Sequence, residues 1–377
     1  MEFVLKVFSL VCLLISILCY YLYSKEVALI DYCGPNTKPF TFNEELCDHI
    51  LQGNISVNST FFQNFINLFS SKPYFRGKFN NRSVVIKTTV SAEDVKKIES
   101  DFIRIFNNVS KDSSSLLFAQ MQVLSLINVP LGTSHLPKLR LCPVNSSTEG
   151  FLNKIPGSSS YEVHDYFRLW TILCSNPEPL ILKMLDPSLW PVPKYYGGCG
   201  QLIVVEDCGL TLTHYHDSEW NIRANISYQL LKNAFKFTFQ DPDFAFYLTD
   251  VSPDNIVVTR EGIVKYIDLE HIILIDRNSI GPKDWSVNHT SKHYDCPNCL
   301  TFEADKICSH QVSDHNIYAL CKEILSDSEL LPGGFLHSVP EPKLYLISHF
   351  IEECIRPRES SRFETAERIM YLLEKYI

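Results

Sequence analysis

The segment from Tyr247 to Asp276 constrains the fold most strongly, because it combines polar side chains with the pattern of a tight hairpin. Its sequence is YLTDVSPDNIVVTREGIVKYIDLEHIILID. The apolar residues over 256–267, interrupted by a glycine-containing turn, predict two short antiparallel strands. Asp250 and Asn255 precede this hairpin, and Asp268 follows its second strand. We therefore expect rigid strands to hold two carboxylates and one amide close together.

These three groups suit phosphoryl transfer. One carboxylate must orient the attacking hydroxyl, and a second must hold the metal ion that neutralises the triphosphate. An amide can bind a second metal ion without adding negative charge. Asp250, Asp268 and Asn255 fit these roles in that order. Asp and Asn are also common in turns for local reasons, so the prediction depends on the complete spacing around the hairpin.

A candidate cation for the phosphate groups lies earlier in the chain. Lys87 ends the run VVIK on a predicted strand over 83–89. An Asn80–Asn81 turn joins this strand to another over 73–79. Lys87 would bind the α- and β-phosphates of a nucleotide. As an isolated strand residue, it would instead be a solvated surface lysine.

The remaining elements place strands mainly before helices. Helical spacing recurs over 91–106, 116–127, 161–173, 219–238, 313–325, 345–355 and 363–375, and further strands are predicted near 194–196 and 201–206. A stretch rich in Pro, Gly and Ser over 129–160 predicts an inserted loop, and 278–311 predicts an irregular segment rich in Cys. This order predicts an α+β fold with a small β-rich lobe and a larger helical lobe, rather than a doubly wound sheet.

The N-terminus predicts entry into the secretory pathway. Val7–Tyr23 is an apolar run preceded by Lys6, which is typical of a signal peptide or an uncleaved signal-anchor. We expect residence in the lumen of the endoplasmic reticulum or Golgi, or secretion, with membrane contact only through this segment if it is uncleaved. The predicted organisation is this segment at 1–24, a Cys-containing extension at 25–72, an N-lobe at 73–206 and a C-lobe at 207–377.

Glycosylation motifs and cysteines agree with that compartment. N-x-S/T sequons occur at Asn54, Asn58, Asn81, Asn108, Asn145, Asn225 and Asn288. Of the 13 cysteines, 11 lie beyond the apolar run, which predicts several disulfides and one odd thiol. Cys296 and Cys299, with Cys308 and Cys321 beyond them, would alternatively form a zinc site or a redox pair.

Composition excludes one class of partner. Hydrophobic content of 45% and charged content of 20% are typical of a globular chain. The formal net charge of −9 argues against nucleic-acid binding, because neutralising phosphates requires a basic face.

Taken together, the motifs resemble the protein-kinase superfamily. Within it, the chain is most similar to the divergent, Cys-rich protein-kinase-domain proteins of the secretory pathway, in their "deleted in autism" branch. The resemblance runs from about Phe75 to the C-terminus and is strongest over Trp190–Asp276. WPVPKYYGGCG is similar to the approach to strand four, LIVVEDCG to strand five and the hinge, DVSPDNIVV to the catalytic loop, and IDLE to the metal-binding motif.

The resemblance implies roles for further residues. Glu206 and Cys208 would offer backbone groups to adenine, and ATP or another nucleoside triphosphate would bind with Mg²⁺ or Mn²⁺. Asp314 in SDHNIYALC would support the catalytic loop, and Arg362 in RPRESSRFETA would brace the C-lobe. Local explanations also exist, since Asp314 would suit a helix N-terminus and Arg362 would suit the surface.

The chain also departs from the kinase pattern. The glycine-rich phosphate loop is reduced to Gly77 in YFRGKFNNRS, and Leu248-Thr249 precede the catalytic aspartate in place of His-Arg. Ser252 replaces the usual lysine, and Glu270 stands where the metal motif has its glycine. Each loss lowers the rate rather than the stability of the fold.

The acid that should pair with Lys87 stays open among Glu99, Glu162 and a position occupied by Gln120. Two functions remain open as well. The first is a kinase that phosphorylates a hydroxyl of a secreted protein or glycan. The second is a pseudokinase that acts as a secreted or Golgi-resident binding protein, for example as the ligand of a cell-surface receptor.

Overall fold

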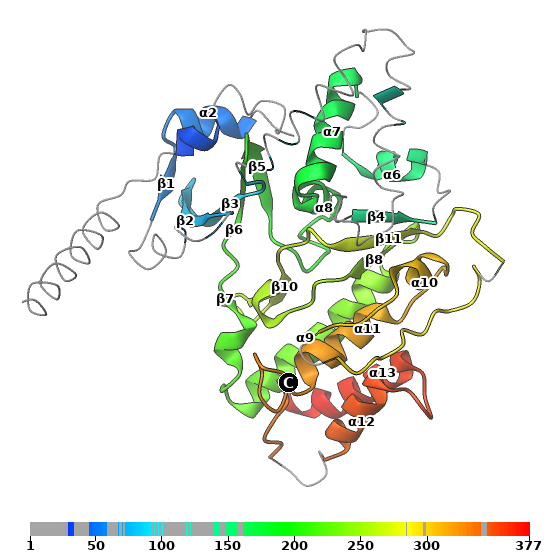
Figure 1. Ribbon diagram of the computed structural model, residues 1–377. Helices are drawn as coiled ribbons and strands as arrows, with labels where there is room; N and C mark the ends of the chain where they lie inside the picture. Colours follow the sequence, from blue (N-terminus) through cyan, green and yellow to red (C-terminus); the bar gives the residue numbers. More distant parts are fainter. Residues whose placement is uncertain are drawn as a thin grey trace, which may run out of the picture. The chain divides into compact units, whose positions relative to one another are not determined.

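The chain is an α+β protein with one sheet-rich region and one helical region, as described by a computed structural model (Figure 1). The structure describes residues 29–33, 45–58, 67, 70, 72–91, 94, 97, 100, 118–119, 121, 139–143, 148–156, 161–283, 285–296, 299–340 and 345–377. These residues fall into two compact units. The first lies within 1–110 and 194–207, and the second within 111–193 and 208–377. Residues 111–193, which were predicted to belong to the N-lobe, thus group with the second unit.

The first unit is built on an antiparallel sheet with the strand order β1-β2-β3-β6-β5. Its strands are β1 (Ile55–Val57), β2 (Tyr74–Phe79), β3 (Arg82–Thr88), β5 (Tyr195–Cys199) and β6 (Leu202–Glu206). Phe79 pairs with Arg82, so Asn80 and Asn81 form the two-residue turn. Both have positive φ, 49° and 62°, which this kind of hairpin requires and Asn tolerates. The predicted hairpin is confirmed.

Apolar side chains from the sheet and from helix α2 (Glu45–Leu51) form the core of the first unit. Leu46 on α2 packs with Val84 and Ile86 on β3, which are fully buried. The short helix η1 (Leu29–Tyr32) precedes α2 and contributes Leu29 to the same core. A disulfide between Cys47 and Cys199 ties α2 to β5, so the helix is fixed to the sheet covalently as well as by burial.

The second unit contains two small sheets. One has the order β4-β11-β8, formed by β4 (Leu139–Cys142), β11 (Ile272–Asp276) and β8 (Phe244–Leu248). The other has the order β10-β9-β7, formed by β10 (Val264–Tyr266), β9 (Ile256–Val258) and β7 (Leu210–Thr211). The antiparallel pair β9 and β10 is the hairpin predicted over 256–267.

The prediction of an inserted loop over 129–160 was wrong for its described part. This stretch contains β4 and helix α6 (Thr148–Lys154). All four residues of β4 are buried, and the strand pairs in parallel with β11. Because its partner strand lies more than a hundred residues downstream, local turn signals could not reveal it.

Helices make up most of the rest of the second unit (Figure 1). They are α7 (Val163–Ser175), α8 (Glu178–Met184), η4 (Leu212–Tyr215), α9 (Trp220–Phe239), η5 (Pro253–Asn255), α10 (Ala304–Cys308), α11 (His315–Leu320), the π-helical η6 (Cys321–Leu325), α12 (Tyr345–Ile355), α13 (Arg362–Leu373) and η8 (Glu374–Tyr376). The long helix α9 contacts both α11 and α13. The predicted helices over 161–173, 219–238 and the last three segments are confirmed.

Four disulfides join cysteines of the described chain. Besides Cys47–Cys199, they are Cys142–Cys308, Cys296–Cys299 and Cys321–Cys354. The prediction of several disulfides among the cysteines beyond the apolar run is confirmed. Cys33, Cys174 and Cys208 lie outside these disulfides, instead of the single odd thiol predicted. The alternative of a zinc site at Cys296, Cys299, Cys308 and Cys321 is wrong, because each sulfur is bonded to another cysteine.

Several predictions lie partly or wholly outside the described residues. The apolar run Val7–Tyr23 and most of the predicted helices over 91–106 and 116–127 belong to this group. Within the described part of the chain, no helix combines the length and the apolar character needed to cross a membrane. Of the sequon asparagines that are described, Asn54, Asn58, Asn81 and Asn288 are exposed, whereas Asn225 is half-buried in α9.

Candidate functional site

The hairpin of β9 and β10 brings Asn255 next to Asp268. Ile256 pairs with Tyr266, so the residues on either side of the hairpin meet at its open end. There the backbone N–H of Ile267 donates a 2.9 Å hydrogen bond to the carbonyl oxygen of Asn255. Asn255, which precedes β9, and Asp268, which follows β10, therefore lie next to each other.

Asp250 reaches the same place from the end of β8. Leu248 pairs with Ile272 in the neighbouring sheet, and the N–H of Thr249 donates to the carbonyl of His271 at 3.3 Å. The Asn255 amide then donates to the carbonyl oxygen of Asp250 at 3.2 Å. As a result, Asp250, Asn255 and Asp268 line one small recess, as the spacing predicted.

The backbone of Asp268 has a rare conformation. Its φ of 60° lies in the left-handed region, which costs a non-glycine residue free energy and is characteristic of functional sites. The N–H of Asp268 donates a 3.1 Å hydrogen bond to a carboxylate oxygen of Glu178. Glu178 begins α8 and is 1% exposed, and its own N–H donates to the Asn176 side chain at 2.8 Å. This buried acid holds the metal-binding candidate in place.

Sequence reasoning did not find Glu178. It stands in the run NPEP, whose prolines indicate a chain break rather than a site. Of the predicted acids for Lys87, Glu99 and the position of Gln120 lie outside the described residues. Glu162 forms a capping box with Asp165 at the start of α7. A buried acid beside the metal motif is visible only in the tertiary structure.

A second acid that the sequence did not indicate is Glu323. It lies on the π-helical turn η6, a type of distortion that is frequent at functional sites. Burial, together with the negative charge of Asp250, raises the pKa of the Glu323 carboxyl, while Lys322 partly offsets the rise. One Glu323 oxygen is buried without a hydrogen-bond partner. A carboxyl in this setting favours its protonated form or a cationic partner.

Two residues of α11 hold the strand that leads into Asp250. The N–H of Leu248 donates to the Asn316 side chain at 3.0 Å, and the Asn316 amide donates to the carbonyl of Phe246 at 2.8 Å. The ring Nε2 of His315 lies 3.0 Å from the carbonyl oxygen of Leu248, to which it must donate. The segment before the candidate catalytic residue is thus fixed from a buried helix.

The expected role of Asp314 was therefore wrong in its details. Asp314 accepts a hydrogen bond from the N–H of Ser291 at 2.8 Å and forms a buried ion pair with Arg362 at 2.7 Å. Arg362 also donates to the carbonyl of Ile355 at 2.8 Å. Arg362 does brace this unit, as expected, whereas the hydrogen bonds to the strand before Asp250 come from Asn316 and His315.

The predicted nucleotide-binding residues differ in their burial and in their hydrogen-bond partners. Lys87 is half-buried on β3, paired with Tyr74 and Ile203. Glu206 ends β6, and its carboxylate accepts the N–H of Lys194 at 3.0 Å. Cys208 is buried.

Gly77 lies within β2 rather than in a loop. A side chain there would collide with the carbonyl oxygen of Ser56 on β1. The close approach of two backbones therefore explains this glycine, which the sequence alone presents as a remnant of a phosphate loop.

The oxygen-rich recess can hold a hard divalent cation. Asp268 and Asn255 offer a carboxylate and an amide oxygen, which are the ligands that Mg²⁺ and Mn²⁺ prefer. Asp250 is exposed, so its carboxylate is accessible to an incoming hydroxyl. The arrangement fits metal-dependent transfer of a phosphoryl group.

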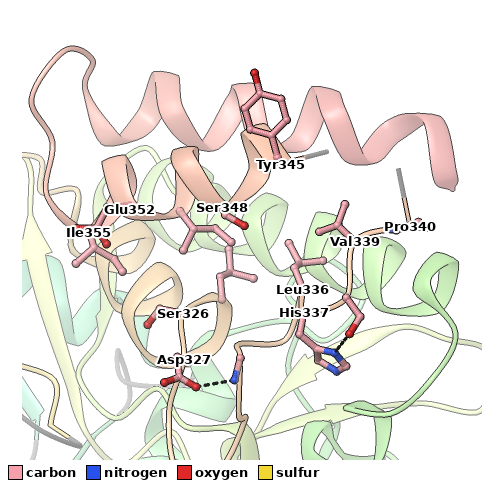
Figure 2. Close-up of a pocket in the computed structure, with 14 residues that line it drawn as sticks. Ser326, Asp327, Leu336, His337, Val339, Pro340, Tyr345, Ser348, Glu352 and Ile355 are labelled. Atoms are coloured by element: carbon pink, nitrogen blue, oxygen red, sulfur yellow. Dashed lines mark hydrogen bonds between the residues drawn. The ribbon is translucent and has the colours of Figure 1, made fainter. Parts of the chain in front are cut away.

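A separate cavity of about 840 Å³ also lies in the second unit (Figure 2). Leu336, His337, Tyr345, Ile351 and Glu352 are among the residues that line it. The N–H of Gly333 donates to Asp327 at its edge, at 2.6 Å. None of the candidate site residues lines this cavity.

Comparison with known proteins supports a divergent kinase-domain family. The family described as the protein-kinase domain of FAM69 matches residues 169–357, which is half of the chain and includes the whole recess. Divergent protein kinase domain 2A is 35% identical over 215 residues in Xenopus tropicalis and 34% identical over 215 residues in Homo sapiens, covering 54% of this chain and 50% of each relative. Divergent protein kinase domain 2B of Homo sapiens is 26% identical over 200 residues, covering 51% of this chain and 44% of that protein. The matches thus span about half the length of these relatives.

Proposed function

The chain belongs to the family of the FAM69 protein-kinase domain, and on this premise we propose that it binds ATP, or another nucleoside triphosphate, together with Mg²⁺ or Mn²⁺. Asp268 and Asn255 hold the metal ion, and Asp250 orients the attacking hydroxyl. The observation that carries the proposal is the convergence of these three side chains on one recess.

The acceptor in this proposal is a hydroxyl group of a secreted protein or glycan. The disulfides favour an oxidising compartment, such as the lumen of the secretory pathway or the extracellular space. The exposed sequon asparagines are suitable for glycosylation there. Lys87, Gly77, Glu206 and Cys208 stay predictions as nucleotide-binding residues.

A second candidate function is that of a pseudokinase, which binds a partner such as a cell-surface receptor without catalysis. Two observations favour it. The packing of β2 against β1 explains Gly77. Among the described residues of the β2–β3 hairpin, no other glycine is left to form a phosphate loop. Ser252 stands where kinases carry a lysine that stabilises the transferring phosphoryl group.

A thermal-shift titration of the purified, glycosylated full chain tests nucleotide binding. Wild type, Asp268→Ala and Asp254→Ala are titrated with ATP and with Mg²⁺ or Mn²⁺. Asp254 is the matched control, because it is an exposed aspartate of the same loop. Ligand at 100 times its dissociation constant stabilises the folded state by about 2.7 kcal/mol. We expect a metal-dependent shift that is lost only in Asp268→Ala, and no shift in wild type would refute the proposal.

Transfer is then measured with γ-labelled ATP and a mixture of secreted proteins and glycans. Asp250→Ala should keep the thermal shift and lose transfer, because its carboxylate acts on the acceptor rather than on the metal ion. A wild-type chain that binds ATP but transfers no label to any acceptor would instead support the pseudokinase.

A further inference from the structure

Two histidines that are 121 residues apart in the sequence meet in the second unit. His216 lies between η4 and α9, and His337 lies on the segment at the edge of the 840 Å³ cavity (Figure 2). Their ring centroids are 4.4 Å apart. The guanidinium of Arg223 holds the two segments together, because it donates to the carbonyl oxygens of Phe335 at 3.0 Å and of His337 at 2.8 Å.

The hydrogen bonds of both rings fix their tautomers. Nε2 of His216 lies 3.1 Å from the carbonyl oxygen of Pro332, and Nε2 of His337 lies 3.0 Å from the carbonyl oxygen of His216. A carbonyl oxygen only accepts, so each Nε2 must carry the proton. In the neutral rings, both Nδ1 atoms therefore keep their lone pairs. The hydroxyl of Ser338 lies 3.0 Å from Nδ1 of His337, where it can donate to that lone pair.

Asp217 completes the cluster. One of its carboxylate oxygens lies 3.3 Å from Nδ1 of His216. When the ring is neutral, two acceptors face each other there with no proton between them. One ligand atom from each of His216, Asp217 and His337 lies within 4.8 Å of the other two. A cation bound by these three side chains would supply the positive charge that the facing acceptors lack.

We infer that His216, Asp217 and His337 form a binding site for a divalent cation of the zinc type. Two imidazoles and one carboxylate are ligands that zinc uses, and the remaining position is open to water. Metal-binding imidazoles characteristically donate their other N–H to a backbone carbonyl, as both rings do here. Bond lengths of about 2.0–2.1 Å put two ligands of a tetrahedral zinc ion roughly 3.4 Å apart, close to the observed separation of Nδ1 and the Asp217 oxygen.

The site would clamp two distant segments of the fold. His216 and Asp217 lie between η4 and α9, whereas His337 belongs to the segment that follows η6. A bound ion would reinforce the contact that Arg223 makes through backbone carbonyls. The ligand set differs from the recess at Asp268, because nitrogen ligands favour zinc over Mg²⁺.

Competition with a chromophoric chelator tests the inference on the full chain after metal removal. We expect one equivalent of Zn²⁺ to bind to wild type and excess Mg²⁺ not to displace it. His216→Gln and His337→Gln should weaken binding at least about 100-fold, because each removes a direct ligand. His349→Gln is the matched control: His349 is exposed on α12 and belongs to no such cluster among the described residues.

Two further variants separate the inference from folding defects and from the nucleotide site. The Asp217 side chain is 96% exposed, so Asp217→Asn should fold normally and still weaken zinc binding roughly tenfold or more. Asp268→Ala should bind Zn²⁺ like wild type even if it loses nucleotide. The inference is overturned if wild type binds no stoichiometric Zn²⁺, or if the two histidine variants and Asp217→Asn bind it unchanged.

Discussion

The backbone N–H of Asp268 donates a 3.1 Å hydrogen bond to the buried carboxylate of Glu178. This contact spans 90 residues of sequence and supports a residue whose φ is 60°. Because that conformation is unfavourable by itself, the surrounding structure must hold it. Glu178 therefore positions the metal-binding candidate without being part of the recess.

Glu178→Ala should weaken metal-dependent nucleotide binding by roughly tenfold, since a hydrogen bond to a charged group contributes about 1.5–3 kcal/mol. Glu178→Gln keeps a side-chain acceptor for the Asp268 N–H and should recover most of the affinity. Calorimetric titration with ATP and Mn²⁺, below the unfolding temperature of both variants, measures the difference. Equal affinity in Glu178→Ala and wild type would show that the contact does not position Asp268.

Gly77→Ala should destabilise the protein even without any nucleotide. The added methyl group would collide with the carbonyl oxygen of Ser56, so β1 must move away from β2, at a cost of about 1–3 kcal/mol. Urea denaturation of the nucleotide-free chain checks this. If stability stays unchanged while nucleotide affinity falls, the glycine serves the phosphates rather than the packing of the strands.

Breaking the buried ion pair between Arg362 and Asp314 should lower the stability of the protein. Arg362→Met leaves the Asp314 carboxylate buried without its cation, and we expect a loss of about 3–5 kcal/mol in the free energy of unfolding. The double variant Arg362→Met with Asp314→Asn should lose less than the sum of the two single variants, because it removes the uncompensated charge. Additive losses in a denaturation cycle would contradict direct coupling of the two side chains.

Stability should fall in mild acid because of His315. Burial lowers the pKa of this imidazole to about 3, against an ordinary value of 6.5. The hydrogen bond to Leu248 opposes this shift, and the charges of His289 and Arg362 add a little to it. The unfolded state then binds the extra proton, so this stability is fully present above pH 6.5 and declines as the pH falls toward 3.

Because of His315, the free energy of unfolding should fall by roughly 1 kcal/mol for each pH unit within that window. His315→Gln retains a donor for the carbonyl of Leu248 but has no titrating group, so its slope between pH 6.5 and 5 should be shallower than that of wild type. Denaturation midpoints at three pH values measure both slopes. Identical slopes would mean that other groups dominate the acid response.

Local sequence determined the recess at Asp250, Asn255 and Asp268 and the hairpin at Asn80–Asn81. In each case the relevant contacts connect residues that are close along the chain, and turn chemistry with alternating apolar residues fixes the register. The same reasoning located α9, α12 and α13 from their periodic apolar faces.

Only the tertiary structure decided which distant groups support and extend that recess. Glu178, Asn316 and Glu323 reach the segments around Asp250 and Asp268 from other parts of the second unit. The pairing of β4 with β11, the partners of the cysteines and the meeting of His216 with His337 were equally hidden. The local pattern of residues predicts the backbone conformation of a segment. Which distant side chain a residue contacts depends on how the whole core packs.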